Sequence, residues 1–194
     1  FRLGQGAVPF LFPLMLQLSF GLSPFESGMV TFVAAIGALA AKFVANWIFK
    51  SWGFKYPLLI ASLVSTLGIL VMGFYVPDTP IPLILGILVF TGFWQSTFWT
   101  GSNAFVFADV EDKDAGQANV ISQVWGQLMF AMGVAVGGGT LELAHRLRGG
   151  GELALADFHT AFFVVSAISA VAVVMFLRIP RNAGHQLMSG PHMH

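Results

Sequence analysis

The sequence contains no cysteine and very little charge. Without cysteine, a protein can hold no disulfide, zinc-thiolate site or cysteine-bound iron-sulfur cluster. Charged residues make up only 9% of the 194 positions, whereas soluble domains carry about 25%. The formal net charge is zero and the basic residues are scattered, so the clustered basic face that nucleic acid requires is missing. We therefore expect no nucleic-acid partner and no cofactor.

Apolar residues dominate instead, because 56% of the chain is hydrophobic and the mean hydropathy is +0.79. A helix needs about 20 mostly apolar residues to cross the hydrocarbon core of a bilayer. Six segments approach that length, with expected bounds 4–22, 25–49, 57–76, 81–108, 115–143 and 158–176. The sequence predicts an all-α integral membrane protein, in which one bundle of six transmembrane helices occupies residues 1–182 and a polar, disordered cytoplasmic tail follows at 183–194.

The loops between the spans indicate the orientation. Six spans place both termini on one side, and Lys and Arg are enriched in loops that face the cytoplasm. The opposite loops hold only Arg146 and Arg148, whereas the side of the termini holds Arg2, Lys50, Lys55, Lys113, Arg178 and Arg181. We expect a multi-pass protein of the cytoplasmic (inner) membrane with both termini cytoplasmic. The start at Phe1, without an initiator methionine, suggests a fragment of a longer protein.

Helix-start signals occur at two of the connections. Ser23, Pro24 and Glu26 supply a capping serine, a proline in the first turn and a glutamate that can cap in return. Residues 112–116, DKDAG, again place acids before a helix start. Because the two connections are three spans apart, they hint at a repeat of three helices.

A lysine lies within the second span. One face of this span is bulky and suited to lipid, whereas the other carries Lys42 and Asn46 among small residues on which a second helix can approach closely. Lys42 therefore faces protein or a water-filled cavity, where a charge at membrane depth is a functional candidate. The alternative is structural, because a long lysine side chain can also snorkel to the cytoplasmic interface.

Three other spans carry polar faces. In the first, Gln5, Pro9, Pro13 and Gln17 follow one another at four-residue steps, and the fourth and fifth combine amides with aromatic rings. Convergent polar groups in an apolar, aromatic wall are typical of a small-molecule site, although each amide alone can serve interhelical hydrogen bonding. The only polar side chains are hydroxyls between Leu58 and Gly73 in the third span and between Phe162 and Leu177 in the sixth, so we expect these two spans to face lipid. This pattern favours a cavity-forming bundle of two three-helix units.

Several stretches resemble a known family. They are RLGQGAVPFLFPLMLQLSFGLSPFESG, GALAAKFVANWIFKSWGFK and FWQSTFWTGSNAFVFADV. In order and spacing they resemble the C-terminal six-helix half of an EmrB/QacA-type drug:proton antiporter of fourteen spans, in the major facilitator superfamily. The resemblance implies half of a transporter fold, with a 3+3 inverted repeat. It also implies alternating access against a missing N-terminal half, and proton-coupled efflux of lipophilic or cationic small molecules.

The chain departs from the family's pattern at two motifs. The basic loop at 49–55, FKSWGFK, lacks the usual aspartate, and the glycine-rich antiporter motif is absent. Gly133, Gly137, Gly138 and Gly139 only imitate that motif, and we interpret them as sites of close helix packing. No acidic residue lies in the middle of a span, so we expect the coupling carboxylate in the missing half.

The polar faces and the resemblance together give the candidate site. The expected partners are a small-molecule substrate, a proton, the lipid bilayer and the missing half. The candidates for coupling or gating are Asp109, Lys50 and Lys55. The candidates for the substrate cavity are Gln17, Lys42, Asn46, Trp94, Gln95, Trp99, Asn103, Gln123 and Gln127.

Two other functions stay open at this point. One is a non-transporting membrane scaffold or an orphan fragment. The other is an intramembrane enzyme, which is disfavoured because all five histidines lie at or beyond the ends of the spans. We expect neither a catalytic residue nor a metal site, since the acids between 109 and 114 lack calcium-loop spacing and Glu142 with His145 forms only a single E-x-x-H pair.

Overall fold

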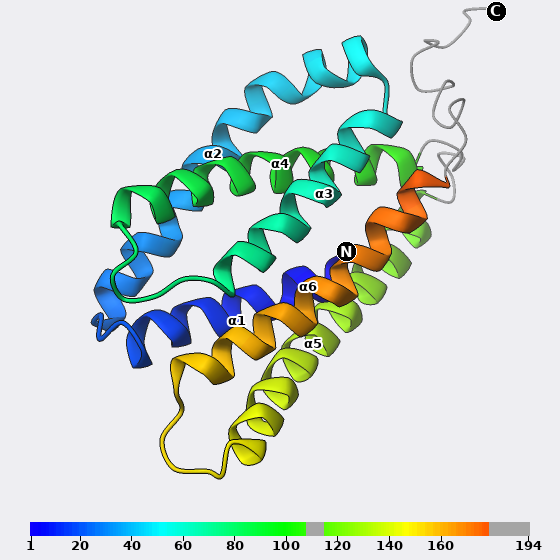
Figure 1. Cartoon of the computed structure of the whole chain (residues 1–194). Coiled ribbons are helices and arrows are strands. Elements are labelled where there is room, and N and C mark those ends of the chain that lie inside the picture. Colours follow the sequence, from blue (N-terminus) through cyan, green and yellow to red (C-terminus); the bar gives the residue numbers. More distant parts are fainter. Residues whose placement is uncertain (108–114, 179–194) are drawn as a thin grey trace, which may run out of the picture.

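The computed structural model describes residues 1–107 and 115–178, and within these ranges the chain is a bundle of helices (Figure 1). Expected features at Asp109, in the acidic segment 109–114 and in the tail 183–194 lie outside the described residues. The described part contains six helices: α1 (Arg2–Leu18), α2 (Pro24–Trp52), α3 (Lys55–Met72), α4 (Ile81–Phe107), α5 (Ala115–Leu147) and α6 (Leu155–Leu177).

Within the described residues, five of these helices, α2 to α6, are long and apolar enough to cross a membrane. The exception is α1, which has 17 residues and spans roughly 25 Å at 1.5 Å per residue. This helix ends at Leu18 instead of the expected residue 22, because the chain turns at Gly21, where φ is +69°. A residue with a side chain rarely adopts this left-handed conformation, so the glycine marks the turn.

The start of α2 has the predicted capping box. The Ser23 hydroxyl accepts a hydrogen bond from the backbone N–H of Glu26 at 3.2 Å, and the Glu26 carboxylate accepts one from the Ser23 N–H at 2.8 Å. Two backbone donors that have no partner within the helix are satisfied in this way. At its other end α2 continues to Trp52, beyond the expected residue 49. We call this end of the bundle the Lys50 end and the opposite end the Glu142 end.

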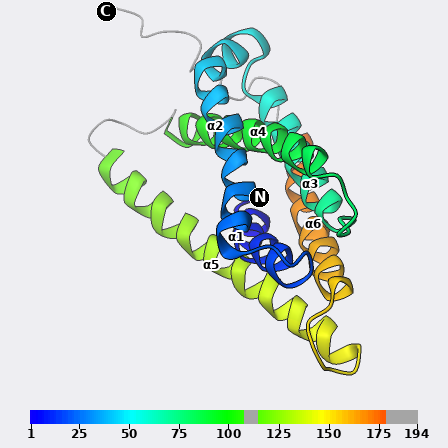
Figure 2. The same cartoon turned by 90° about the vertical axis from the view of Figure 1, so that its left-hand side faces the viewer.

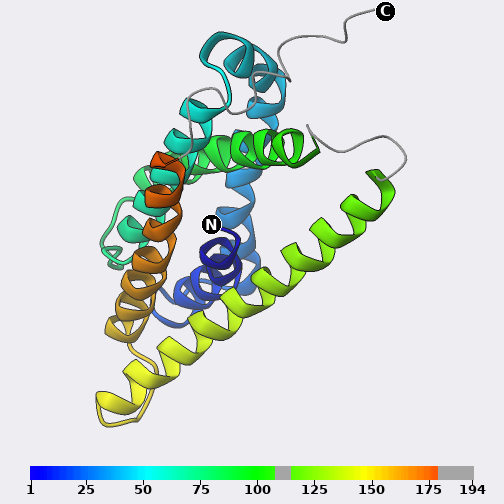
Figure 3. The ribbon, with the colours of Figure 1, turned by 90° about the vertical axis from the view of Figure 1, so that its right-hand side faces the viewer.

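The helix contacts have the symmetry of two three-helix units. α2 packs along α4, α5 packs along α1, and α3 packs against α6. Suppose that α1, α2 and α3 are exchanged with α4, α5 and α6, respectively. The α2–α4 pair then becomes the α5–α1 pair and the reverse, and the α3–α6 pair stays the same. This is the arrangement of an internal repeat. Figures 2 and 3 show α1 in the middle of the bundle, with α5 crossing it on one side and α6 on another.

Glycines set the distance at both repeated crossings. A Cβ atom on Gly37 or Gly92 would collide with a backbone carbonyl of the facing helix in the α2–α4 pair, and the same holds for Gly6 and Gly133 in the α1–α5 pair. Gly137 also lies against Ala7 of α1. The structure thus confirms the interpretation of Gly133 and Gly137 as sites of close packing, in which small residues let two helix backbones approach. Gly138 makes only an ordinary contact with the Phe10 ring, and for Gly139 the interpretation is wrong, because there is open space around it.

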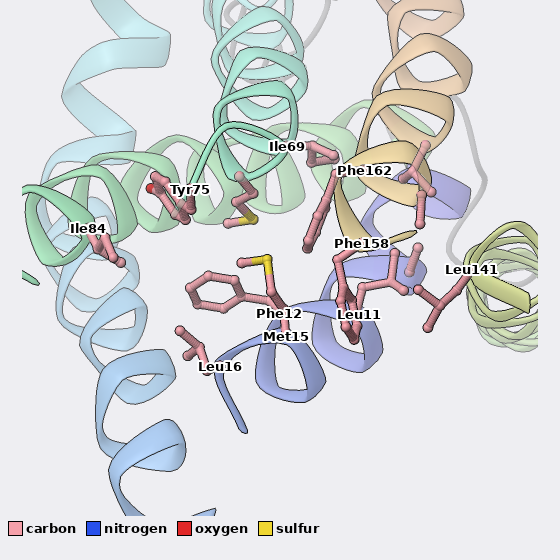
Figure 4. Packing of buried hydrophobic residues seen from close by; sticks show 14 of the residues in the cluster. Leu11, Phe12, Met15, Leu16, Ile69, Tyr75, Ile84, Leu141, Phe158 and Phe162 are labelled. Atoms are coloured by element: carbon pink, nitrogen blue, oxygen red, sulfur yellow. The ribbon is translucent and has the colours of Figure 1, made fainter. Parts of the chain in front are cut away.

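The core lies between α1, α3, α4 and α6. Leu11, Phe12 and Met15 of α1 are at most 2% exposed and pack with Phe158 and Phe162 of α6 (Figure 4). Lipid chains are as apolar as these side chains, so dispersion and shape complementarity, rather than escape from water, hold the cluster together. The central position of α1 follows from this buried face.

The expectation that the third and sixth spans simply face lipid needs correction. α3 and α6 pack on each other, and their serines Ser62, Ser65, Ser166 and Ser169 are all buried. Ser65 borders a cavity and Ser169 lies against Gly4 of α1. Half of the apolar window of α3 is buried, whereas only 17% of that of α2 or α5 is buried. Small hydroxyl residues in an apolar span therefore marked close helix contact instead of a lipid surface.

Candidate functional site

Two cavities open between the helices and share two residues, Ala34 of α2 and Gln95 of α4. The first has a volume of about 300 Å³ and lies between α1, α2, α3 and α4. Its polar groups come from Gln5, Thr31, Ser65, Thr91 and Gln95, and its apolar wall includes Phe12, Ile69, Met72 and Leu88. A mostly apolar hollow with a few polar groups is the usual form of a small-molecule site.

The prolines of α1 line the first cavity. Proline has no N–H, so Pro9 and Pro13 leave the carbonyls of Gln5 and Pro9 without their helical donors. Both prolines border the cavity, where unpaired backbone carbonyls are tolerated at membrane depth. The Pro13 carbonyl in turn accepts a hydrogen bond from the Ser27 hydroxyl of α2 at 3.3 Å. The prolines therefore leave two backbone carbonyls without helical donors on residues that border the cavity.

The second cavity contains four of the nine residues that the sequence predicted for the substrate cavity. It has a volume of about 420 Å³, lies between α2 and α4, and is lined by Lys42, Gln95, Trp99 and Asn103 together with Ala34, Ala35, Ala38, Gly92, Ser96 and Thr100. Four of the expected residues thus share one hollow. We call it the Lys42 cavity.

The position of Lys42 follows from the packing of α2. The small residues on its face of the helix lie against α4, and the bulky face points away, with Phe43 87% exposed. Lys42 precedes the end of α2 at Trp52 by ten residues, which corresponds to about 15 Å along the helix axis. Lys42 therefore lies about three turns from the end of α2, where its exposed side chain borders the open side of the cavity.

The other candidates lie elsewhere. Trp94 packs against the small cluster of Leu58, Ala61 and Phe98. Gln17 is half-buried on α1, Asn46, Gln123 and Gln127 are exposed, and none of these four lines either cavity. Lys50 is exposed in the last turn of α2, and Lys55 is half-buried in the first turn of α3.

The sequence analysis missed Arg2 as a site residue and counted it only as a loop charge. Its guanidinium lies over the indole of Trp99, with Cζ 4.6 Å from the ring centroid. Nη1 also donates a hydrogen bond to the Ser122 carbonyl of α5 at 3.4 Å. A Cβ on Gly126 would collide with this guanidinium. The sequence signal for Arg2 was the combination of Trp99 on α4, which can accept a cation on its ring, and Gly126 on α5, which leaves room for a guanidinium.

A separate polar cluster closes the Glu142 end. Asp157 is 1% exposed and accepts hydrogen bonds from Arg148 at 2.9 and 3.0 Å and from the Ala154 N–H at 2.9 Å. The bond to Asp157 raises the pKa of Arg148. Burial raises the pKa of Tyr75, near the same end, to about 12. The cluster fixes the loop between α5 and α6, and it takes no part in either cavity.

The lone E-x-x-H pair is not arranged as a metal site. Glu142 accepts a hydrogen bond from Arg146 at 2.6 Å, whereas the His145 ring lies 3.5 Å from Asp157. Within residues 1–107 and 115–178, no group of three histidine or acidic side chains could hold a metal ion.

Similar proteins have transporter names. The chain is 26% identical over 197 residues to the "Putative multidrug resistance protein MdtD" of Enterobacter sp. (strain 638), covering 97% of the chain and 41% of that protein. It is 25% identical over 190 residues to the "Probable transport protein HsrA" of Haemophilus influenzae, covering 98% of the chain and 41% of that protein. The chain thus spans about two fifths of the length of these relatives. No solved structure matches it.

The comparison with protein families covers nearly the whole chain. Residues 1–189 match the profile described as Major Facilitator Superfamily. The match agrees with an all-helical bundle whose contacts repeat after three helices and with a multi-pass membrane protein. It points to transport and away from enzymatic catalysis. By this match, the chain belongs to the Major Facilitator Superfamily.

Proposed function

We propose that the chain is the C-terminal part of a secondary active transporter that exports lipophilic small molecules by alternating access. The observation that carries the proposal is the Lys42 cavity, in which a charge, two amides and an indole from α2 and α4 converge. Polar and aromatic groups converging within a bundle of apolar helices form a binding site that a solute can enter. The transporter names of the relatives support the same conclusion.

The partner of this bundle is the missing N-terminal half of the same transporter. α2 and α5 carry the largest exposed apolar surfaces, including Phe25, Met29, Phe32, Val120, Ile121, Val124 and Trp125. A second helical half that packs against these two helices would cover part of these surfaces and would turn the open cavities into a central vestibule. Rocking of the two halves would then expose the vestibule to each side in turn.

We place the transporter in the inner membrane, with the Lys50 end in the cytoplasm, and infer coupling to protons. Every acidic residue in the described part lies in a loop or near the Glu142 end: Glu26, Asp78, Glu142, Glu152 and Asp157. Because coupling requires a titratable group at depth, we assign the coupling carboxylate to the missing half. Lys50 and Lys55, together with Asp109, stay candidates for gating at the cytoplasmic end.

The experiment is transport in everted membrane vesicles from an efflux-deficient host that expresses the complete transporter. A panel of lipophilic fluorescent compounds is added, and uptake is followed with and without a proton gradient. We expect gradient-dependent uptake that falls several-fold in each of Lys42→Met, Gln95→Ala and Asn103→Ala. Gln117→Ala, which changes an exposed amide of α5 outside both cavities, is the matched control.

Two results would contradict the proposal. Uptake that does not depend on the gene would favour the alternative of a non-transporting scaffold. Gene-dependent uptake that all three cavity variants leave unchanged would remove the Lys42 cavity from the substrate path.

A further inference from the structure

The charges of the described residues are segregated along the bundle. At the Glu142 end both arginines are paired, because Arg146 lies 2.6 Å from Glu142 and Arg148 lies 2.9 Å from Asp157. No other ion pair between described residues involves an arginine or a lysine. The cations towards the Lys50 end therefore stand without acidic partners in the described part of the chain.

Two of these cations are associated with Trp99, one by direct contact and one through a shared cavity. Lys42 and Trp99 line the Lys42 cavity from α2 and α4, and the Arg2 guanidinium stacks on the Trp99 ring from α1. Within residues 1–107 and 115–178, neither cation forms an ion pair. The acids at 109, 111, 112 and 114 lie outside the described residues. The described surroundings of Trp99 are thus aromatic, amide-bearing and positively charged.

The position of Arg2 is fixed by its surroundings. The Ser122 carbonyl accepts a hydrogen bond from Nη1, and Gly126 leaves the room that the guanidinium occupies. A planar guanidinium has five N–H donors, so a single backbone acceptor leaves most of them unused. A preorganised cation with free donors is suited to an anionic oxygen and repels a positively charged ligand.

From this arrangement we propose that the Lys42 cavity selects lipophilic organic anions over lipophilic cations. The inference rests on the proposed transport function and narrows its substrate class, which the family resemblance left as lipophilic or cationic. The Trp99 indole contacts the apolar body of the ligand, and Gln95 and Asn103 donate hydrogen bonds to it. Lys42 attracts the negative charge of the ligand from the wall of the cavity, and Arg2, which does not line the cavity, adds positive potential through its position on the Trp99 ring. Lys42 and Asn103 are exposed in the described chain. In the complete transporter, the second half that we propose would cover this side of the cavity, and water would then screen these charges less than at a surface.

The test compares two probes of nearly the same size and shape but opposite charge, tetraphenylborate and tetraphenylphosphonium. Binding of each is measured on the complete transporter in nanodiscs of uncharged lipid, with empty nanodiscs subtracted. We expect the unmodified protein to bind tetraphenylborate at least about tenfold more tightly than tetraphenylphosphonium, since one charge contact of moderate strength is worth about a factor of ten. This comparison needs no variant and so does not depend on any variant folding.

Variants then assign the preference to residues. Lys42→Met should weaken tetraphenylborate binding about tenfold while leaving tetraphenylphosphonium binding equal or stronger, and Lys42→Arg should retain the preference. Arg2→Gln should act in the same direction as Lys42→Met. Arg146→Gln removes an equal charge from an exposed position at the Glu142 end and should change neither affinity.

The outcomes separate this inference from the proposed function. Tighter binding of tetraphenylphosphonium, or equal binding of both probes, overturns the anion preference while gene-dependent uptake in vesicles can still stand. Equal weakening of both probes in Lys42→Met also overturns it, because Lys42 would then support the fold or pair with a carboxylate of the other half. If neither probe binds and the vesicle panel shows no gene-dependent uptake, both proposals fail.

Discussion

Single glycines decide how closely the paired helices lie. Gly37 faces the Val89 carbonyl and Gly92 faces the Ala34 carbonyl, and both contacts occur on the stretch of α2 and α4 that leads into the Lys42 cavity. In a bilayer, two helices gain little from burying apolar side chains and depend on tight contact between their surfaces. The glycines therefore control both the stability of the pair and the width of the cavity beside it.

Adding one methyl group at this crossing tests the point. Gly92→Ala should lower the thermal stability of the purified protein, because the new Cβ would meet backbone of Ala34 that cannot rotate away. Overpacking of this kind costs about 1–3 kcal/mol. Gly86→Ala is the matched control, since Gly86 lies on the same helix with open space around it, and alanine there should be neutral or slightly stabilising. Equal melting temperatures for the two variants would contradict the packing argument.

Whole helices could be predicted better than their mutual contacts. Apolar runs and the Ser23 capping signal indicate where α2 begins, because these are local properties of the chain. The end of α1 at Leu18 could not be predicted from hydropathy, which continues through Phe20 and Leu22, since a glycine turn decides it. Local signals thus predict helices, and turn geometry corrects their ends.

Helical periodicity shows which residues share a face but not which helix covers that face. Lys42, Gln95 and Asn103 come together because α2 packs along α4. Gln123 and Gln127 are one helical turn apart and so share a face of α5, yet both side chains are exposed in the described chain. Arg2 joins the site through a contact between three helices, which no pattern within one helix contains. The sequence alone did not show which helices pack against each other.

The capping box at the start of α2 makes a prediction for this helix. Ser23→Ala removes the hydroxyl that accepts the Glu26 N–H, so the first turn of α2 should fray and the free energy of unfolding should fall by about 1 kcal/mol. Ser51→Ala, an exposed serine near the other end of α2 without a side-chain hydrogen bond to any described residue, is the control. Thermal melting in detergent compares the two variants, and equal melting temperatures would show that tertiary contacts alone fix this helix end.

The bundle as a whole combines a symmetric framework with an asymmetric charge distribution. The α2–α4 and α1–α5 pairs repeat each other down to their glycine contacts. The charges do not repeat, because α2 carries Lys42 in its middle, whereas α5 has no charged residue before Glu142. An inverted repeat supplies two similar helix crossings, but their cations differ: Lys42 of α2 lines the cavity beside α4, whereas Arg2 lies at the start of α1 and contacts α5 at Ser122. The framework accounts for the movement that we propose, and the unequal charges account for the selectivity.

The orientation of the bundle can be tested with single cysteines, because this chain contains none of its own. In a complete transporter made free of cysteine, Lys50→Cys reports on the Lys50 end and Glu152→Cys on the loop between α5 and α6, and both positions are exposed. An excess of Lys and Arg in the loops at the Lys50 end predicts that this end is cytoplasmic. A membrane-impermeant maleimide should therefore label Glu152→Cys in intact cells and Lys50→Cys only in everted vesicles.

Phe43→Cys, on the bulky face of α2, should resist labelling in both preparations, because a maleimide reacts with thiolate and hydrocarbon suppresses ionisation of the thiol. The reverse labelling of the first two positions would place the Lys42 cavity near the opposite side of the membrane and would rule out cytoplasmic termini.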